Sequence, residues 1–244
     1  MNYYLEDLKK LEKKFAQYLK SIIPTDYIAI SSFLIERILN SAGIYKFETN
    51  YILNFNYIML REKQNSVSDN VHGTLGNLDY MESIEQLFTS LGINNEPELI
   101  FGIDESSETS EGMEIFKKTH RKLFLEQSSK KLPETCDYIV VYGHSLAKAD
   151  YSYFQSLFDL YDIYGSNIKL IFAVNEDAED ISTKANDVYK LLHHYGKRVH
   201  GEAKGNNLLH KLLLENRIQL KNIAFLLKLA SIKNSAEEQG QPEG

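Results

Sequence analysis

The stretch Asp137-Tyr138-Ile139-Val140-Val141-Tyr142-Gly143 decides the fold class. Its five central residues are all aromatic or β-branched, which favours a strand, and they are apolar on both faces, as in the centre of a parallel sheet. Helical periodicity follows over 150–164, and a second apolar stretch over 168–174 predicts another buried strand. A strand, a helix and a second strand in this order predict a βαβ unit, and therefore a parallel sheet in an α/β protein.

Helical patterns dominate on either side of this unit. Pro24 ends the first helix, and Gly43 is a stop signal for the second. The expected helices cover 2–21, 25–40, 79–91, 111–128, 178–195, 205–215 and 216–233, with strands over 51–57 and 99–102 and a polar loop over 62–70. We expect one helix-rich α/β domain over 1–233, with an N-terminal helical part (1–45), a sheet core (51–175), C-terminal helices (178–233) and then a disordered tail (234–244).

The composition is that of a globular protein with an acidic balance. The 244 residues include 27 Lys and Arg against 34 Asp and Glu, a net charge of −7, which argues against general nucleic-acid binding. The single cysteine, Cys136, excludes an intramolecular disulfide and a Cys-rich zinc site, and fits a reducing compartment. No apolar run approaches the ~20 residues that cross a bilayer, and the first residues lack the pattern of a secretory signal. We therefore expect a cytoplasmic protein without a metal and without membrane association.

Four short segments with polar residues lie at or just after the carboxyl ends of expected strands. In open α/β sheets, the carboxyl ends of the strands are where ligands bind. We therefore expect these polar tips to converge on one cleft. The four segments are Asn54-Phe55-Asn56-Tyr57, Val71-His72-Gly73, Gly143-His144-Ser145-Leu146 with Asp150, and Ala173-Val174-Asn175-Glu176.

The segment Gly143-His144-Ser145 leads from a buried strand toward a helix. A glycine lets the backbone turn sharply and approach a ligand, and the amides that follow can face a phosphate. The alternative interpretation is an ordinary βα turn in which Ser145 or Asp150 caps the helix.

The other polar tips also have two interpretations each. His72 can transfer protons near neutral pH, or it can be a surface-loop histidine beside the turn former Gly73. Asn56 can bind water or a ribose hydroxyl, or it can form an Asx turn that ends the strand. Asn175 can meet ribose hydroxyls, or it can belong to a solvated acidic turn.

A rival interpretation makes Ser145 a nucleophile. Gly143-His144-Ser145-Leu146-Ala147 resembles the G-x-S-x-G elbow of the α/β-hydrolases, with Ala147 in place of the last glycine. A hydrolase needs further strands that present an acid and then a histidine. Only one strand is expected after this elbow, so hydrolysis by Ser145 ranks third among the functions considered.

Taken in order, the four segments resemble the bacteriophage abortive-infection AbiH family. The resemblance begins in Leu8-Lys9-Lys10-Leu11-Glu12-Lys13-Lys14-Phe15-Ala16-Gln17-Tyr18-Leu19, includes Phe101-Gly102-Ile103-Asp104, and extends through Gly143-His144-Ser145-Leu146-Ala147-Lys148-Ala149-Asp150. It implies a bacterial antiviral defence protein that confers resistance to phage.

The AbiH family is in turn similar to sirtuin-like Rossmann domains, in which such residues line one NAD pocket. This resemblance implies that His72 is a base on a ribose hydroxyl and that Asn56 positions water or the hydroxyl. It also implies that NAD cleavage would halt the growth of an infected cell. The implied cofactor-binding residues are Gly73, Gly143, His144, Ser145, Asp150 and Asn175.

The sequence departs from the family pattern at its beginning. AbiH proteins typically open with a strand and a Gly-Asn-Gly-Phe-Asp loop, whereas this sequence contains no Gly-x-Gly. Since such a loop cradles pyrophosphate, we expect the sheet to lack its first strand. The alternative is a non-catalytic interaction module or truncated remnant, whose terminal helices bind a protein or a second copy. The helical stripe expected for this contact is Leu209, Leu212, Leu213, Asn216, Leu220, Ile223 and Leu227.

Overall fold

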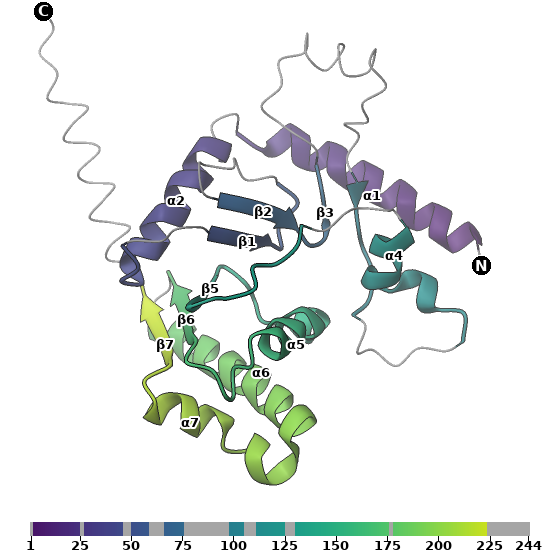
Figure 1. The fold of residues 1–244 in the computed structure, drawn as a ribbon. Coiled ribbons are helices and arrows are strands. Elements are labelled where there is room, and N and C mark those ends of the chain that lie inside the picture. Colours follow the sequence, from purple (N-terminus) through teal and green to yellow (C-terminus); the bar gives the residue numbers. More distant parts are fainter. Residues whose placement is uncertain are drawn as a thin grey trace, which may run out of the picture. The chain divides into compact units, whose positions relative to one another are not determined.

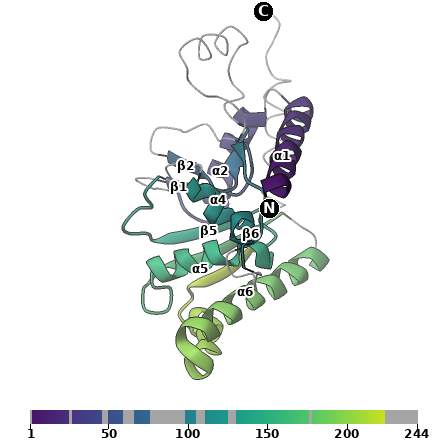
Figure 2. The same cartoon turned by 90° about the vertical axis from the view of Figure 1, so that its right-hand side faces the viewer.

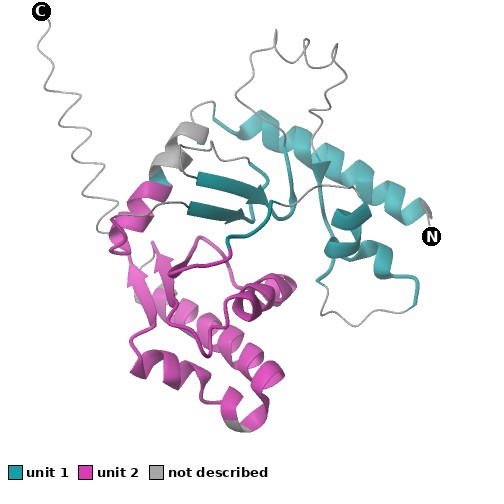
Figure 3. Ribbon diagram, in the orientation of Figure 1, with its two compact units in different colours: residues 1–34, 47–133 teal, residues 35–46, 134–244 magenta. Residues whose placement is uncertain are grey.

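The computed structural model describes most of the chain and divides it into two compact units (Figure 3). Unit 1 comprises residues 1–34 and 47–133, and unit 2 comprises residues 35–46 and 134–244. The described residues are 2–24, 27–45, 50–58, 66–75, 98–104, 111–124, 130–175 and 178–223. The single domain over 1–233 stays a prediction, and the expected disordered tail and the expected helix over 79–91 lie outside the described residues.

Unit 1 combines helices with two small sheets (Figure 1). Helix α1 (Asn2–Ile22) is followed by the first part of α2 (Tyr27–Ser41). Strands β1 (Asn50–Asn54) and β2 (Ser66–Asn70) are parallel, with Asn54 opposite Asn70. Strands β3 (Gly73–Thr74) and β4 (Glu98–Leu99) are antiparallel, and a 3₁₀ helix (Glu114–Phe116) precedes α4 (Lys118–Phe124).

The core of unit 1 forms where α1 meets β4. Ala16 is buried together with Leu75 and Leu99, and Phe15 packs against this cluster. The periodicity that predicts α1 is therefore explained by burial of one helix face. On the same helix, the carboxylate of Glu12 is buried and paired with Arg121 of α4.

Unit 2 contains a three-stranded parallel sheet in the order β5-β6-β7. The strands are β5 (Tyr138–Tyr142), β6 (Lys169–Val174) and β7 (Ile218–Asn222). A 3₁₀ turn (Lys148–Asp150) and α5 (Tyr151–Leu160) connect β5 to β6, and α6 (Ala178–Gly205) and α7 (Leu208–Leu214) connect β6 to β7. The predicted βαβ unit is confirmed, and the described chain is a mixed α/β protein with small parallel sheets.

The two faces of this sheet bury different residues. Ile171 of β6 packs against Ala42 and Ile44, which follow α2, together with Val140 of β5. Two successive crossovers in the same direction place α5 and α6 on one side of a parallel sheet, as Figure 2 shows. Since both faces are covered, β6 is apolar in every position after Lys169.

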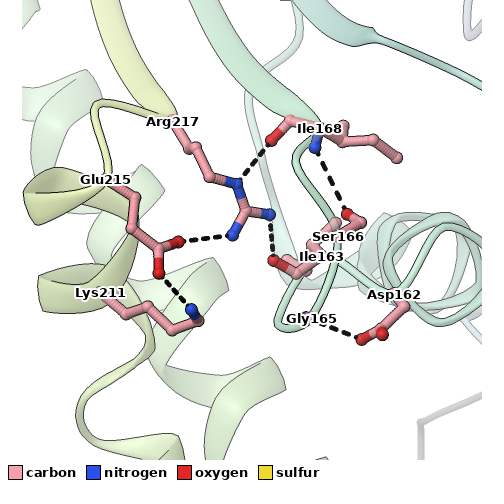
Figure 4. A network of polar contacts seen from close by, with 8 residues as sticks. All are labelled: Asp162, Ile163, Gly165, Ser166, Ile168, Lys211, Glu215 and Arg217. Carbon is pink, nitrogen blue, oxygen red and sulfur yellow. Dashed lines mark hydrogen bonds and ion pairs between the residues drawn. The ribbon is translucent and has the colours of Figure 1, made fainter.

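A buried arginine fastens the turn before β7 to the turn before β6 (Figure 4). Arg217 donates from Nε to the Ile168 carbonyl at 3.0 Å and from Nη2 to the Ile163 carbonyl at 2.5 Å. Its Nη1 donates to Glu215 at 2.8 Å, and Glu215 also pairs with Lys211. These bonds hold the start of β7 beside the start of β6.

Several expected elements are wrong, each for a physical reason. Residues 66–70 form β2 rather than a loop, because pairing with β1 outweighs their polar composition. The helix expected from residue 111 begins at Lys118, since Lys117 bridges to Ile103 in a parallel contact. Among the described strands, β5 lies at the edge of its sheet and β6 is central, so the central position expected for 138–142 is wrong.

The expected helix over 216–233 is also wrong within its described part. Helix α7 ends at Leu214, Asn216 has a positive φ of 53°, and 218–222 are strand β7. The leucine stripe through Leu220 is therefore no single helix face. Two described strands, rather than one, follow the turn at Gly143. In the described part of the chain, no helix is both long and apolar enough to cross a membrane.

Candidate functional site

A cavity of about 170 Å³ lies in unit 2 at the carboxyl ends of β5 and β6. These strands are adjacent and parallel, with Tyr142 opposite Ala173, so their ends meet at the same edge of the sheet. The strands supply apolar walls, and the turn after β5 supplies the polar rim. The lining residues that matter for the chemistry are Gly143, His144, Asn175 and Lys184.

Gly143 gives the cavity an open wall of backbone. Its φ is +65°, a conformation that side chains disfavour, and a Cβ added there would meet no atom within 4 Å. The next residues complete a tight turn in which Leu146 also has a positive φ, of 56°. Two left-handed residues so close together show that neighbouring contacts impose the shape of this turn.

His144 supplies those contacts. Its Nδ1 accepts a hydrogen bond from the Leu146 amide at 2.9 Å, and its Nε2 lies 3.4 Å from Asp150 Oδ2. Because Nδ1 is an acceptor here, the proton of a neutral ring lies on Nε2, toward Asp150. The ring also packs edge-to-face against Phe154 at 5.0 Å between centroids. His144 therefore shapes the turn, and both its nitrogens are engaged by the protein.

Lys184 of α6 closes the rim of the cavity. Its Nζ donates to the His144 carbonyl oxygen at 2.8 Å, and the side chain is partly buried. This lysine is absent from the residues predicted from the sequence. A lysine in an amphipathic helix, 40 residues after His144, looks like any solvated lysine in the sequence.

The remaining unit 2 residues divide into those at the cavity and those beside it. Asn175 lines the cavity, directly after β6. Asp150 occupies the N-cap position of α5, but its side chain makes no capping hydrogen bond and its carboxylate faces His144 instead. Ser145 is exposed and does not line the cavity. The adjacent His144 has no nitrogen available to activate its hydroxyl.

In unit 1, asparagines organise the carboxyl ends of β1 and β2. Asn54 is buried, and its Oδ1 accepts the Asn56 amide at 3.0 Å, which forms an Asx turn. Asn54 Nδ2 donates to the Ile58 carbonyl at 2.6 Å, and Asn70 Nδ2 donates to the Asn56 carbonyl at 2.9 Å. The Asx turn expected at Asn56 is thus built by Asn54, and the Asn56 side chain is exposed.

His72 lies between β2 and β3, and Gly73 is the first residue of β3. His72 is only 7% exposed, and its ring packs edge-to-face against Phe55 at 5.5 Å between centroids. It is therefore a buried residue and no surface-loop histidine. Gly73 has a φ of +83°, and a Cβ there would lie 1.8 Å from the Glu98 carbonyl oxygen. Gly73 is required for the pairing of β3 with β4.

The structure thus brings the predicted residues together in two groups. Gly143, His144, Asp150 and Asn175 gather around the cavity of unit 2, while Asn56, His72 and Gly73 belong to the strand ends of unit 1. Convergence of the two groups on one cleft stays a prediction. Among the described residues, no three His, Cys, Asp or Glu side chains gather as metal ligands would.

Comparison with known proteins gives one match. A family model described as "Bacteriophage abortive infection AbiH" matches residues 1–172 of this chain. No curated protein and no solved structure matches the sequence. The matched region includes both strand ends of unit 1 and the turn at Gly143. The chain belongs to the bacteriophage abortive infection AbiH family, and its function therefore lies in abortive infection.

Proposed function

We propose that this AbiH protein acts in abortive infection by binding a nucleotide of the NAD class at the carboxyl ends of β5 and β6, on a Rossmann-type, sirtuin-like sheet. The observation that carries this proposal is the cavity, which is lined by the bare backbone of Gly143 and by Lys184. Nucleotides bind at this edge of open α/β sheets, where backbone can approach a phosphate.

The residues that line the cavity of unit 2 fit one part of a dinucleotide. A volume of about 170 Å³ is below the ~300 Å³ at which pockets for whole drug-sized ligands begin, so this cavity suits one ribose-phosphate portion. Gly143 leaves room for a phosphate against the backbone, and the Asn175 amide can both donate to and accept from a ribose hydroxyl. Ser145 would contact the ligand from outside the cavity.

Cleavage of NAD is the activity proposed for the bound nucleotide. In this reaction the bond between nicotinamide and ribose breaks, nicotinamide leaves as a neutral molecule, and a water oxygen forms the new bond to the same ribose carbon. His72 accepts a proton from a ribose hydroxyl, and Asn56 positions the water or the hydroxyl. The attacking water gives one proton back to the ribose oxygen, and the proton held by His72 then passes to solvent, so that one proton is released per NAD cleaved. The buried setting of His72 supports this role, because a ring held by packing keeps one orientation.

Calorimetric titration with NAD and ADP-ribose tests the binding proposal, and chromatography of released nicotinamide tests cleavage. The informative variant is Gly143→Ala, which adds a methyl group, in open space, to a residue that lines the cavity. Gly201→Ala is the matched control, since Gly201 also has a positive φ (+70°) with nothing within 4 Å of a Cβ, but does not line the cavity.

We expect Gly143→Ala to weaken binding at least tenfold, a change of about 1.4 kcal/mol, while Gly201→Ala binds as the wild type does. Equal binding by both variants would overturn the proposed location, and no binding by wild type would overturn the ligand class. His72→Ala should abolish nicotinamide release without abolishing binding. Intact NAD after long incubation with wild type would refute cleavage alone.

A second candidate function is assembly with another copy of this chain through α1. Tyr4, Leu11, Tyr18 and Ile22 share one side of this helix and are 73%, 54%, 57% and 54% exposed. The helix carries five lysines against three acidic residues, within a chain of net charge −7, so its charge complements the rest of a second copy. Light scattering tests this: we expect a dimer that Leu11→Glu converts to a monomer, and a monomeric wild type would refute it.

A further inference from the structure

We infer that Lys184 is the anion-binding residue of the cavity, so that the ligand must carry a phosphate group. This inference rests on the proposed function and names the part of the nucleotide that the cavity recognises. Lys184 lines the cavity from α6 and has no counterpart among the residues predicted from the sequence.

The charge of Lys184 is unbalanced within the described part of unit 2. Its ammonium group makes one hydrogen bond, to a carbonyl oxygen, and no ion pair with a described carboxylate. The nearby carboxylate of Asp150 faces His144 Nε2 instead. An ammonium group has three donors, of which a described protein acceptor takes one, so the others can be donated to a ligand. A partly buried cation beside a cavity favours an anionic ligand, because screening by water is weak there.

The turn after β5, which also lines the cavity, supports the same assignment. Gly143 presents backbone without a side chain, and a Cβ there would meet nothing within 4 Å. A phosphate is small enough to approach such a backbone closely, and a positive φ turn can direct peptide N–H groups at an anion. Cation and open backbone thus face one space from α6 and from the turn after β5.

The position of Lys184 is fixed through the turn it closes. Its acceptor is the carbonyl of His144, whose ring is held by the Leu146 amide and faces Asp150. A ligand phosphate therefore meets an ammonium group that is already placed, which lowers the entropy lost on binding.

Binding of adenosine, AMP and inorganic pyrophosphate by the whole chain tests the inference. In wild type we expect AMP to bind at least about tenfold more tightly than adenosine, the contribution of a hydrogen bond to a charged group. Lys184→Gln should reduce this ratio to near one and abolish pyrophosphate binding, and Lys184→Arg should restore both in part. Lys190→Gln is the matched control, since Lys190 lies on the same helix, 54% exposed and paired with Asp187.

The outcomes separate this inference from the proposed function. Equal binding of AMP and adenosine by wild type, or an unchanged ratio in Lys184→Gln, would overturn the role of Lys184 while leaving nucleoside binding intact. Pyrophosphate binding that requires Lys184, without any nucleoside binding, would support the anion site and refute the nucleotide. Circular dichroism of Lys184→Gln checks that the variant is folded, and a folded Lys184→Arg that also fails to bind would count against the inference.

Discussion

Glu12 and Arg121 form a buried ion pair in unit 1. The effect of removing one of these two charges can be worked out closely from the structure. Their side chains are 7% and 6% exposed. Arg121 Nη2 donates to Glu12 Oε2 at 2.8 Å, and Nη1 donates both to Glu12 Oε1 and to the Phe101 carbonyl, the latter at 2.5 Å. The Phe101 amide in turn donates to Glu12 Oε1 at 2.6 Å. One carboxylate therefore joins α1, α4 and the segment after β4.

Removing either partner leaves the other as an uncompensated buried charge, which destabilises a protein by about 3–5 kcal/mol. We therefore expect Glu12→Leu and Arg121→Met each to lower the free energy of unfolding by that amount. The double variant should regain part of it, because an apolar pair of similar volume avoids the desolvation of both ions. The rest stays lost, because the Phe101 amide and carbonyl no longer have their partners. The interaction energy between the two sites is thus predicted to exceed about 2 kcal/mol, far above the ~0.5 kcal/mol expected for independent sites.

Urea unfolding followed by far-ultraviolet circular dichroism gives the four free energies, since the chain has no tryptophan. Hydrogen exchange of the peptide containing Phe101 adds a local reading, because its amide is bonded to Glu12. We expect faster exchange of this amide in Glu12→Leu. Additive losses in the double variant, or single losses below about 1 kcal/mol, the range of exposed pairs, would show that this ion pair does not hold unit 1 together.

Three further outcomes follow from packing and from protonation. The pKa of Tyr195 is raised above its ordinary 10.0, mainly by burial and also by its hydrogen bond to a carboxylate. The neutral phenol therefore stabilises the fold below pH 10, and this contribution is lost as the pH rises further. Tyr195→Phe should therefore lose less stability between pH 10 and 11 than wild type, by up to about 1.4 kcal/mol per pH unit, and parallel pH profiles would contradict this. Gly73→Ala should lower stability by more than about 1 kcal/mol for its left-handed backbone alone, with the overlap on Glu98 adding to the loss; a melting temperature equal to that of wild type would disprove it. Arg217→Met should lower stability by about 2–5 kcal/mol, since it leaves two buried carbonyl groups without their donor, and a urea midpoint within error of wild type would contradict that role.

The sequence predicts helices and strands correctly where a segment buries an apolar face. Strands β5 and β6 are short apolar runs, and α1 shows one apolar stripe, so their periodicity predicts them. Strand β2 is polar and exists through pairing with β1, which no local pattern records. Strand β7 continues a leucine-rich pattern from α7, and the change from helix to strand depends on the turn at Asn216.

The sequence predicts the residues of the candidate site only where they follow a strand that the sequence also predicts. Gly143 and Asn175 follow apolar strands, so the sequence alone predicts that they lie at one sheet edge. The engagement of His144 Nδ1 depends on the backbone of Leu146, which adopts a positive φ without any glycine signal. Lys184 reaches the cavity through the packing of α6, a tertiary arrangement that helical periodicity does not specify.

Hydrogen-exchange mass spectrometry of wild type with and without saturating NAD tests most directly whether the nucleotide occupies the cavity of unit 2. Bound nucleotide covers the backbone at the ends of β5 and β6, so we predict slower exchange in the peptides that span 142–147 and 173–175. With NAD held at the wild-type dissociation constant, these peptides should exchange measurably more slowly in wild type and almost unchanged in Gly143→Ala. Slower exchange confined to other described segments, or no change anywhere, would contradict the assignment of the nucleotide to this cavity.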